Sequence, residues 1–206
     1  MTTKYSFTEV RNQLLKDLRG AYPTKWEDFR GAKVLGEDIF GSPKPHPNAV
    51  LNLFETQNVR FAIPFAAYRV SIGGFSSLMS DKPGTVLPRR TLATAIQGMH
   101  VLRSMGSHLA RVVAHGGDLE RCPDQLPRCA LTIETRCIKE RKEALEKIYN
   151  SLADEREGGV LTPPLLEHFV CAKCARVIVA AHTSWGSICW KKLPPVFAIS
   201  NSWDDL

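Results

Sequence analysis

The feature that most constrains the fold is the segment 88–114, whose apolar side chains recur with the period of an α-helix. They are Leu92, Ile96, Met99, Leu102, Leu109 and Val113. Residues three or four apart share one face of a helix, so this pattern predicts a long helix with one buried face. Gly98 and Gly106 lie inside it and cost about 1 kcal/mol each relative to alanine, unless a neighbouring helix packs closely there.

Other stretches show the same period, and none shows the alternation of a strand. Helices are predicted over residues 5–21, from Pro47 onward, and over residues 61–71, 131–155 and a last segment from Cys171 through Trp190. The sequence therefore predicts an all-α fold, an irregular bundle of helices joined by long loops. A loop around residues 79–87 is expected to separate an N-terminal helical region, 1–80, from a C-terminal helical bundle, 85–206, that holds the cysteines.

Composition and the N-terminal segment bear on where the protein works. The chain has 206 residues and a formal net charge of +6. It contains no apolar run near the ~20 residues of a membrane span. The first residues lack the apolar centre of a signal peptide. We therefore expect a location inside the cell, in the cytoplasm or nucleus, and no membrane partner.

The six cysteines include a pair, Cys171-x2-Cys174, at the spacing that chelates metals. Zinc prefers four thiolate or imidazole ligands, and Cys129 and Cys137 are the candidates for the second pair. A structural zinc ion bound by Cys129, Cys137, Cys171 and Cys174 is therefore one interpretation. The other is that these are buried thiols that act as small apolar side chains, since a disulfide framework is not expected inside the cell. Both interpretations stay open, and zinc is the one cofactor that the sequence suggests.

The segment 82–117 contains no acidic residue. Besides Lys82, its basic and imidazole side chains are Arg89, Arg90, Arg103, Arg111, His100, His108 and His115. Such a helix could contact phosphate groups. However, no aromatic residues interleave with these charges to stack on bases, and a solvent-exposed face of an ordinary helix explains the pattern better. We expect a protein partner rather than nucleic acid.

No motif indicates catalysis. His168 and His182 lie near Cys171 and Cys174 in sequence, but no hydrolase or transferase signature accompanies them. The glycine pairs lack the pattern of a phosphate-binding loop, and there is no HExxH. The prediction is a protein without enzymatic activity and without catalytic residues.

Aromatic residues gather near the C-terminus, at Trp185, Trp190, Phe197 and Trp203. They could anchor a partner, because aromatic side chains dominate binding hot spots. Core positions are the commoner use of such residues. We expect Trp190, Leu193 and Phe197 to be buried against the last helices.

Four ordered stretches give the chain a family resemblance. They are Tyr5-x4-Val10-Arg11 to Tyr22-Pro23 with Trp26; Ala49-Val50-Leu51-Asn52-Leu53 with Ile63-Pro64-Phe65-Ala66-Ala67-Tyr68-Arg69; Cys137-x3-Arg141; and Cys171-x2-Cys174 with Trp190-x2-Leu193-Pro194-x2-Phe197 and Trp203-x2-Leu206. The chain thereby resembles the helical region after the BTB domain of basidiomycete fungal BTB/POZ proteins.

The resemblance implies a function as well as a fold. It implies a non-catalytic module for protein interaction or scaffolding, and the alternative is a zinc-stabilised regulatory protein associated with nucleic acid. Only four residues precede Tyr5, so the BTB domain itself is expected to be absent from this chain.

Overall fold

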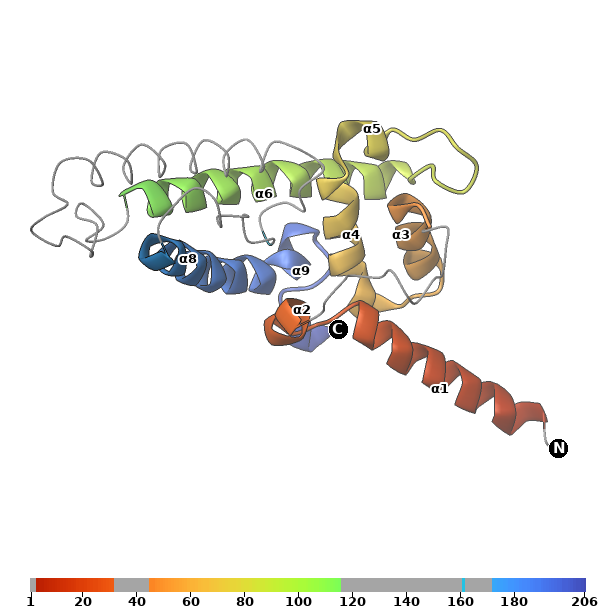
Figure 1. Ribbon diagram of the computed structural model, residues 1–206. Helices are drawn as coiled ribbons and strands as arrows, with labels where there is room; N and C mark the ends of the chain where they lie inside the picture. The colour runs from red at the N-terminus through yellow and green to blue at the C-terminus, as the bar shows by residue number, and fades with distance from the viewer. Residues whose placement is uncertain (1–2, 32–44, 116–160, 162–171) are drawn as a thin grey trace, which may run out of the picture. The chain divides into compact units, whose positions relative to one another are not determined.

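The computed structural model describes residues 3–31, 45–115, 161 and 172–206. Every regular element within these residues is a helix, which confirms the predicted all-α class (Figure 1). In chain order they are α1 (Thr3–Ala21), α2 (Trp26–Gly31), α3 (Pro47–Thr56), η1 (Arg60–Ala62), α4 (Ile63–Ile72), α5 (Gly74–Leu78), α6 (Arg89–His115), α8 (Ala172–Lys191), α9 (Leu193–Val196) and η3 (Trp203–Asp205).

The chain divides into two compact units. The first combines Met1–Met99 with Trp190–Leu206, and the second is His100–Cys189. The boundaries between them fall within α6 and α8. The predicted division of the chain near residues 79–87 into separate domains stays a prediction.

A cluster of aromatic side chains forms the core of the first unit. Its buried members are Tyr22, Trp26, Phe29, Phe54, Phe65, Tyr68 and Trp190. The ring centroid of Trp190 lies 4.9 Å from that of Phe29 and 5.5 Å from that of Phe65. Its other neighbours include Trp203, which stacks on it at 5.2 Å. Such pairs contribute about 0.5–1.5 kcal/mol each beyond the area that they bury, so Trp190 is a centre of this core.

The burial of the C-terminal aromatic residues was predicted correctly, but their packing partners were not. Trp190, Leu193 and Phe197 are buried. The expected partners were the last helices, whereas Trp190 packs on Phe29 of α2 and Phe65 of α4. The reason is that α2 and α4 place the rings of Phe29 and Phe65 within reach of Trp190, whereas α9 (Leu193–Val196) carries no aromatic residue.

The long helix was predicted to within a residue at each end. Residues 88–114 were expected, and α6 runs over Arg89–His115. The structure also explains Gly98, because a β-carbon there would overlap the ring of Phe197. The predicted helix over residues 131–155 lies outside the described residues.

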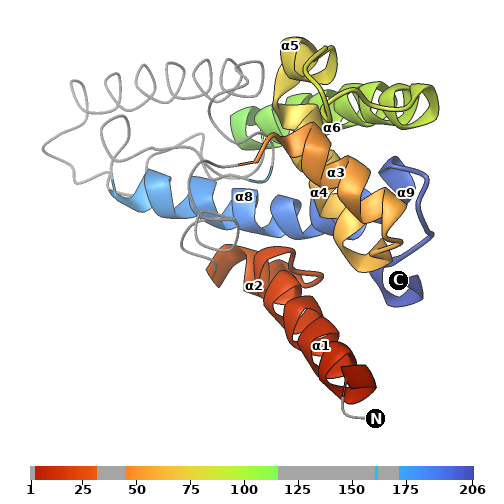
Figure 2. The ribbon, with the colours of Figure 1, turned by 90° about the vertical axis from the view of Figure 1, so that its right-hand side faces the viewer.

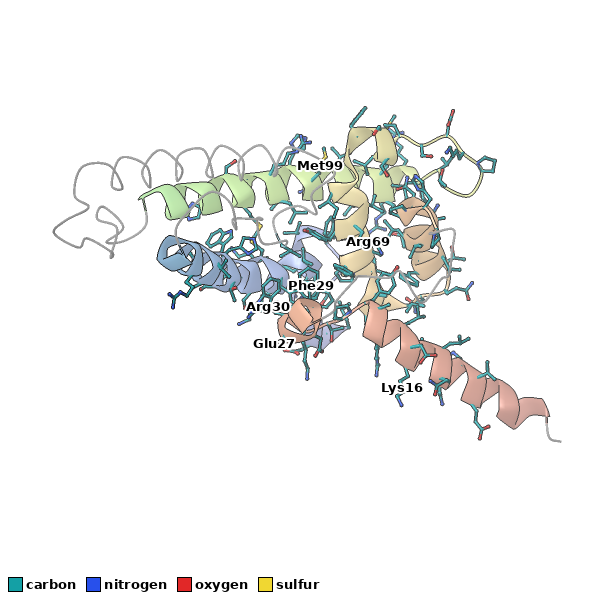
Figure 3. All side chains as sticks on the ribbon, in the orientation of Figure 1. Lys16, Glu27, Phe29, Arg30, Arg69 and Met99 are labelled. Atoms are coloured by element: carbon teal, nitrogen blue, oxygen red, sulfur yellow. The ribbon has the colours of Figure 1, made fainter. Side chains whose placement is uncertain are left out.

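Helix α1 covers the predicted range, residues 5–21, but part of its apolar face is exposed. Val10 and Leu14 are 56% and 58% exposed. Side chains such as Lys16 extend from this helix along its length (Figure 3). Periodicity alone shows that a helix has an apolar face, and it does not show what covers that face.

In the second unit, α6 and α8 are joined through Trp185. Its indole N–H donates a hydrogen bond of 3.2 Å to the main-chain oxygen of Met105. Its ring also lies 4.8 Å from the imidazole of His108. Of the two roles considered for Trp185, partner anchor or packing residue, these contacts support packing.

Candidate functional site

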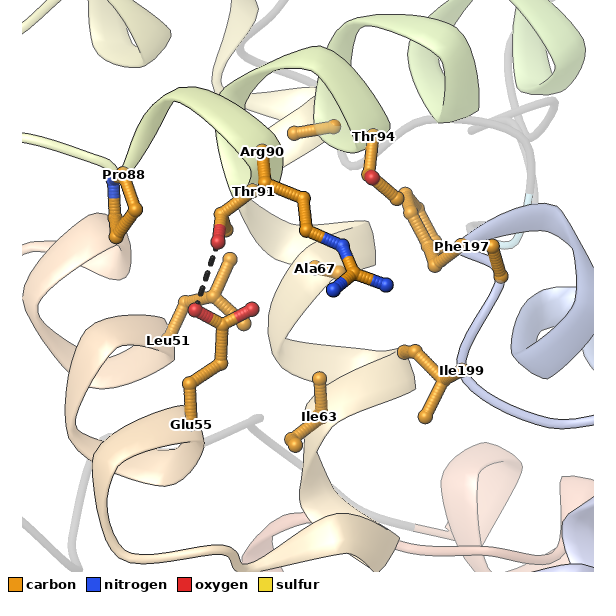
Figure 4. A pocket seen from close by; sticks show the side chains of 12 residues that line it. Leu51, Glu55, Ile63, Ala67, Pro88, Arg90, Thr91, Thr94, Phe197 and Ile199 are labelled. Atoms are coloured by element: carbon orange, nitrogen blue, oxygen red, sulfur yellow. Dashed lines mark hydrogen bonds between the residues drawn. The ribbon is translucent and has the colours of Figure 1, made fainter.

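A pocket of about 420 Å³ opens in the first unit between α3, α4, the first turns of α6 and the segment 197–199 (Figure 4). We call it the α3–α6 pocket. Its lining residues are Leu51, Glu55, Ile63, Ala67, Pro88, Arg90, Thr91, Thr94, Ala95, Phe197, Ala198 and Ile199. Most of them are apolar, and the charged side chains among them are Glu55 and Arg90.

Helices α3 and α4 form two sides of the pocket and lie side by side (Figure 2). Pro47 occupies the first turn of α3, as predicted. The side chain of His46 accepts a hydrogen bond from the main-chain N–H of Asn48. A short turn that includes Asn58, with a positive φ of 52°, leads into η1 and α4. Asparagine tolerates this conformation better than most residues, so the two helices can pack directly against each other.

Two asparagines of α3 fix the chain just before α6. The buried side-chain amide of Asn48 donates to the main-chain oxygens of Ser77 and Thr85, at 2.8 and 2.9 Å. One turn later, the amide of Asn52 donates to Val86 at 2.9 Å. These bonds hold the segment that leads into α6 against α3, and they bring the first turns of α6 to the edge of the pocket.

The opposite wall is the segment 197–199, where the chain reverses after α9. Ala198 has a φ of +50°, and the amides of Ala198 and Ile199 donate to the oxygens of Pro195 and Pro194 at 3.1 and 3.0 Å. The ring of Phe197 lies on Gly98. Contacts on both sides therefore hold this wall in place, which favours a preformed pocket.

The two charged side chains of the pocket differ in their partners. Thr91 donates its hydroxyl to Oε2 of Glu55 at 2.8 Å, which holds that carboxylate near α6. Arg90 has no hydrogen bond or ion pair to the described residues, and it is exposed. Its guanidinium extends over the pocket toward Ile63 and Ile199 (Figure 4). The pocket thus presents a positive group above an apolar surface.

The predicted zinc ligands fall almost entirely outside the described residues. Cys129, Cys137 and Cys171 lie outside them, and Cys174 lies in α8, where its side chain is not among those described. Within the described part of the chain, no three or more His, Cys, Asp or Glu side chains gather as a metal site would require. The zinc site at these four cysteines stays a prediction.

The basic residues of α6 that the structure describes lie in solvent. Arg89, Arg90, His100 and Arg103 are exposed, and His108 is as well. The side chains of Arg111 and His115 are outside the described set. Ala95, Met99 and Leu102 form the buried face of the same helix. An amphipathic helix has this arrangement, with its charged side chains in solvent and its apolar side chains toward the core.

Of the residues considered for a cysteine–histidine pair, the structure describes the side chain of His182 alone. It is buried within α8. The side chains of His168, Cys171 and Cys174 are not described. The predicted lack of enzymatic activity stays a prediction.

Sequence reasoning did not find the α3–α6 pocket. Arg90 was noted as one charge of a basic helix, and Glu55 was not singled out. The available signal was the dipeptide Arg89-Arg90 directly after Pro88, because cations are unfavourable at a helix N-terminus unless something else requires them. The wall at residues 197–199 could not be placed, since it comes from a segment about one hundred residues later.

No protein family, curated protein or solved structure was found to match this chain. The resemblance to the region after the BTB domain of fungal proteins therefore stays a prediction. Among the helices that the structure describes, none combines the length and apolar character needed to cross a membrane.

Proposed function

We propose that the chain is a non-catalytic protein-interaction module, similar in role to the C-terminal region of the fungal BTB proteins that it resembles. Its partner binds by inserting a short segment into the α3–α6 pocket. The proposal keeps the intracellular location and the protein partner expected from the sequence. The observation that carries it is the pocket itself, an apolar hollow with an exposed arginine at its edge that has no ion pair with the described residues.

The size of the pocket suits a few side chains of a larger partner. A volume of about 420 Å³ lies in the range of roughly 300–1,000 Å³ typical of ligand sites. Interfaces commonly combine a buried apolar centre with a polar rim. Here Leu51, Ile63 and Ala67 supply the apolar part, and the rim includes Thr91 and Thr94. Thr94 is half-buried, so a bound side chain would contact it directly.

A pair of variants on α6 tests this function. Thr94→Trp would fill the pocket from its edge, whereas Ala93→Trp adds the same side chain at an exposed neighbouring position that does not line the pocket. Random nine-residue peptides, displayed with both ends fused to a carrier, would be selected on the wild-type protein. Thermal melts of both variants would confirm that each is folded.

The expected result is a set of enriched peptides that bind the wild type and Ala93→Trp equally. Thr94→Trp should bind them at least roughly tenfold more weakly, because the added indole occupies the space of a buried anchor side chain. Peptides that bind Thr94→Trp as well as the wild type would show that the pocket is not the binding site. A selection that enriches no peptide would contradict the function itself.

A further inference from the structure

We infer that the segment bound in the α3–α6 pocket carries one acidic side chain beside an aliphatic or aromatic one, and that Arg90 binds its carboxylate. This inference rests on the proposed function and adds the chemistry of the partner.

The guanidinium of Arg90 is available to bind an anion in the pocket. It extends over the pocket (Figure 4), and it has no hydrogen bond or ion pair with the residues that the structure describes. Guanidinium groups bind carboxylates through two parallel hydrogen bonds, a geometry that no other common protein anion except phosphate matches. A carboxylate in the pocket would give Arg90 a partner that none of the described residues supplies.

Arg90 lies in the first turn of α6, at the positive end of the helix. Helix α6 begins at Arg89, and its first turn contains no acidic residue. The N-terminus of a helix carries a partial positive charge, to which Arg89 and Arg90 add. The helix N-terminus, Arg89 and Arg90 together create a positive potential that attracts an anion to this side of the pocket.

Glu55 limits the number of acidic residues that the ligand can carry. Its carboxylate is held by Thr91 on the α3 side of the pocket, away from the wall at Ile199. A ligand carboxylate at Arg90 therefore has room on the Ile199 side, while a second carboxylate beside it would be repelled by Glu55. The ligand should carry a single acidic residue rather than an acidic run.

The apolar lining selects the neighbour of that acidic residue. Leu51, Ala67 and Phe197 are buried side chains whose surfaces face the hollow. An aliphatic or aromatic side chain of the ligand would cover them and exclude water from the contact at Arg90. Exclusion of water strengthens the charged contact, so the two parts of the ligand act together.

Arg89 provides a matched control, because it is exposed on the same helical turn and does not line the pocket. Arg89→Gln and Arg90→Gln change the net charge and the helix end equally. Peptides from the selection, acetylated and amidated to remove their terminal charges, would be titrated against the wild type and both variants by fluorescence anisotropy. Each peptide would also be made with its acidic residue replaced by the corresponding amide.

We expect Arg90→Gln to weaken binding roughly tenfold or more, the loss typical of a charged hydrogen-bonded contact. Arg89→Gln should weaken it by no more than about twofold, because exposed charges are screened by salt. The amide peptide should bind the wild type as weakly as the acidic peptide binds Arg90→Gln. Combining the two changes should cause no further loss, which is the signature of a direct pair.

Two results would overturn the inference while leaving the proposed function intact, provided that Thr94→Trp still blocks binding. They are equal losses for Arg89→Gln and Arg90→Gln, and amide peptides that bind as tightly as acidic ones. Failure of the selection would end both proposals together.

Discussion

The indole N–H of Trp190 donates a hydrogen bond of 3.0 Å to the main-chain oxygen of Thr24, a residue 166 positions earlier in the chain. The indole of Trp203 in turn donates to the main-chain oxygen of Trp190 at 2.8 Å. The first bond attaches the C-terminal segment to the turn between α1 and α2, and the second holds Trp203 against Trp190. Because the wall at residues 197–199 lies between these two tryptophans in sequence, the α3–α6 pocket depends on this attachment.

Trp190→Ala should destabilise the first unit by about 3–5 kcal/mol, the usual cost of removing a large buried aromatic side chain. Trp190→Phe should cost less, because it keeps a ring in the cluster and loses mainly the bond to Thr24 and some contact area. Urea denaturation of both variants measures the difference, with Lys191→Ala at an exposed neighbouring position as the control. A loss below about 1 kcal/mol for Trp190→Ala would contradict the role of this side chain in the core.

Gly98→Ala should destabilise the protein even though alanine favours a helix by about 1 kcal/mol over glycine. The β-carbon of the new alanine would overlap the ring of Phe197. Because Phe197 is buried, its ring has little room to move away. Gly20 of α1 is the matched control, since a β-carbon there would contact nothing within 4 Å. Gly20→Ala should therefore stabilise the protein by about 0.5–1 kcal/mol.

Thermal or urea unfolding of the two alanine variants should thus give changes of opposite sign. Equal stabilisation by both would show that Phe197 does not pack on Gly98, and the wall of the α3–α6 pocket would then be placed incorrectly.

The helices of this chain could be read from its sequence because their signals are local. The apolar period of residues 88–114 and the proline at position 47 each depend on neighbours within a few residues. The partners of each helix could not be read in the same way. The stripe with Val10 and Leu14 predicts an apolar face equally well whether it is buried or, as observed, exposed.

Asn48→Ala should destabilise the first unit by about 2–4 kcal/mol. Asn48 is fully buried, and its loss would remove the side-chain donor to the main-chain oxygen of Thr85 and leave that of Ser77 with the 3.3 Å bond from the amide of Ser80. A buried acceptor left without a donor costs about 1–3 kcal/mol. Asn52→Ala removes the same kind of bond one turn later, where the bonds are exposed to solvent. Asn52→Ala should cost less than about 1 kcal/mol. Equal losses of stability for the two variants in urea denaturation would contradict the role of the buried hydrogen bonds of Asn48.

Asp205 should give the C-terminal turn a dependence on acid. Hydrogen bonds from Ser202 and then Ser200 hold the pKa of its carboxyl below the ordinary value. A carboxyl with a lowered pKa stabilises the fold above its unfolded-state pKa, and this contribution is lost as the pH falls through the folded-state pKa. A ¹³C NMR titration of the carboxyl checks the direction.

Ser202→Ala is the variant for that titration, because it removes the hydroxyl that lowers the pKa of Asp205 most and leaves Ser200 in place. The pKa of Asp205 should rise toward its ordinary value in this variant. An unchanged pKa would mean that the hydroxyl of Ser202 does not bond to the carboxylate in solution.

The candidate site was harder to anticipate than the helices, for a physical reason. Glu55, Arg90 and Ile199 belong to three segments that are far apart in the sequence and meet only in the fold. A pocket built from distant segments has no spacing rule, unlike a metal-binding pair such as Cys171 and Cys174. The sequence showed the charge of Arg90, and only the fold shows the apolar surface below it.

The most direct test of the account is a methyl NMR titration of the protein with a selected peptide that carries one acidic and one adjacent apolar residue. The methyl signals of Ile63, Ile199 and Leu51, which line the α3–α6 pocket, should shift as peptide is added, and should shift much less in Arg90→Gln at the same peptide concentration. Shifts confined to exposed apolar residues elsewhere, such as Val10 and Leu14 of α1, would contradict the account.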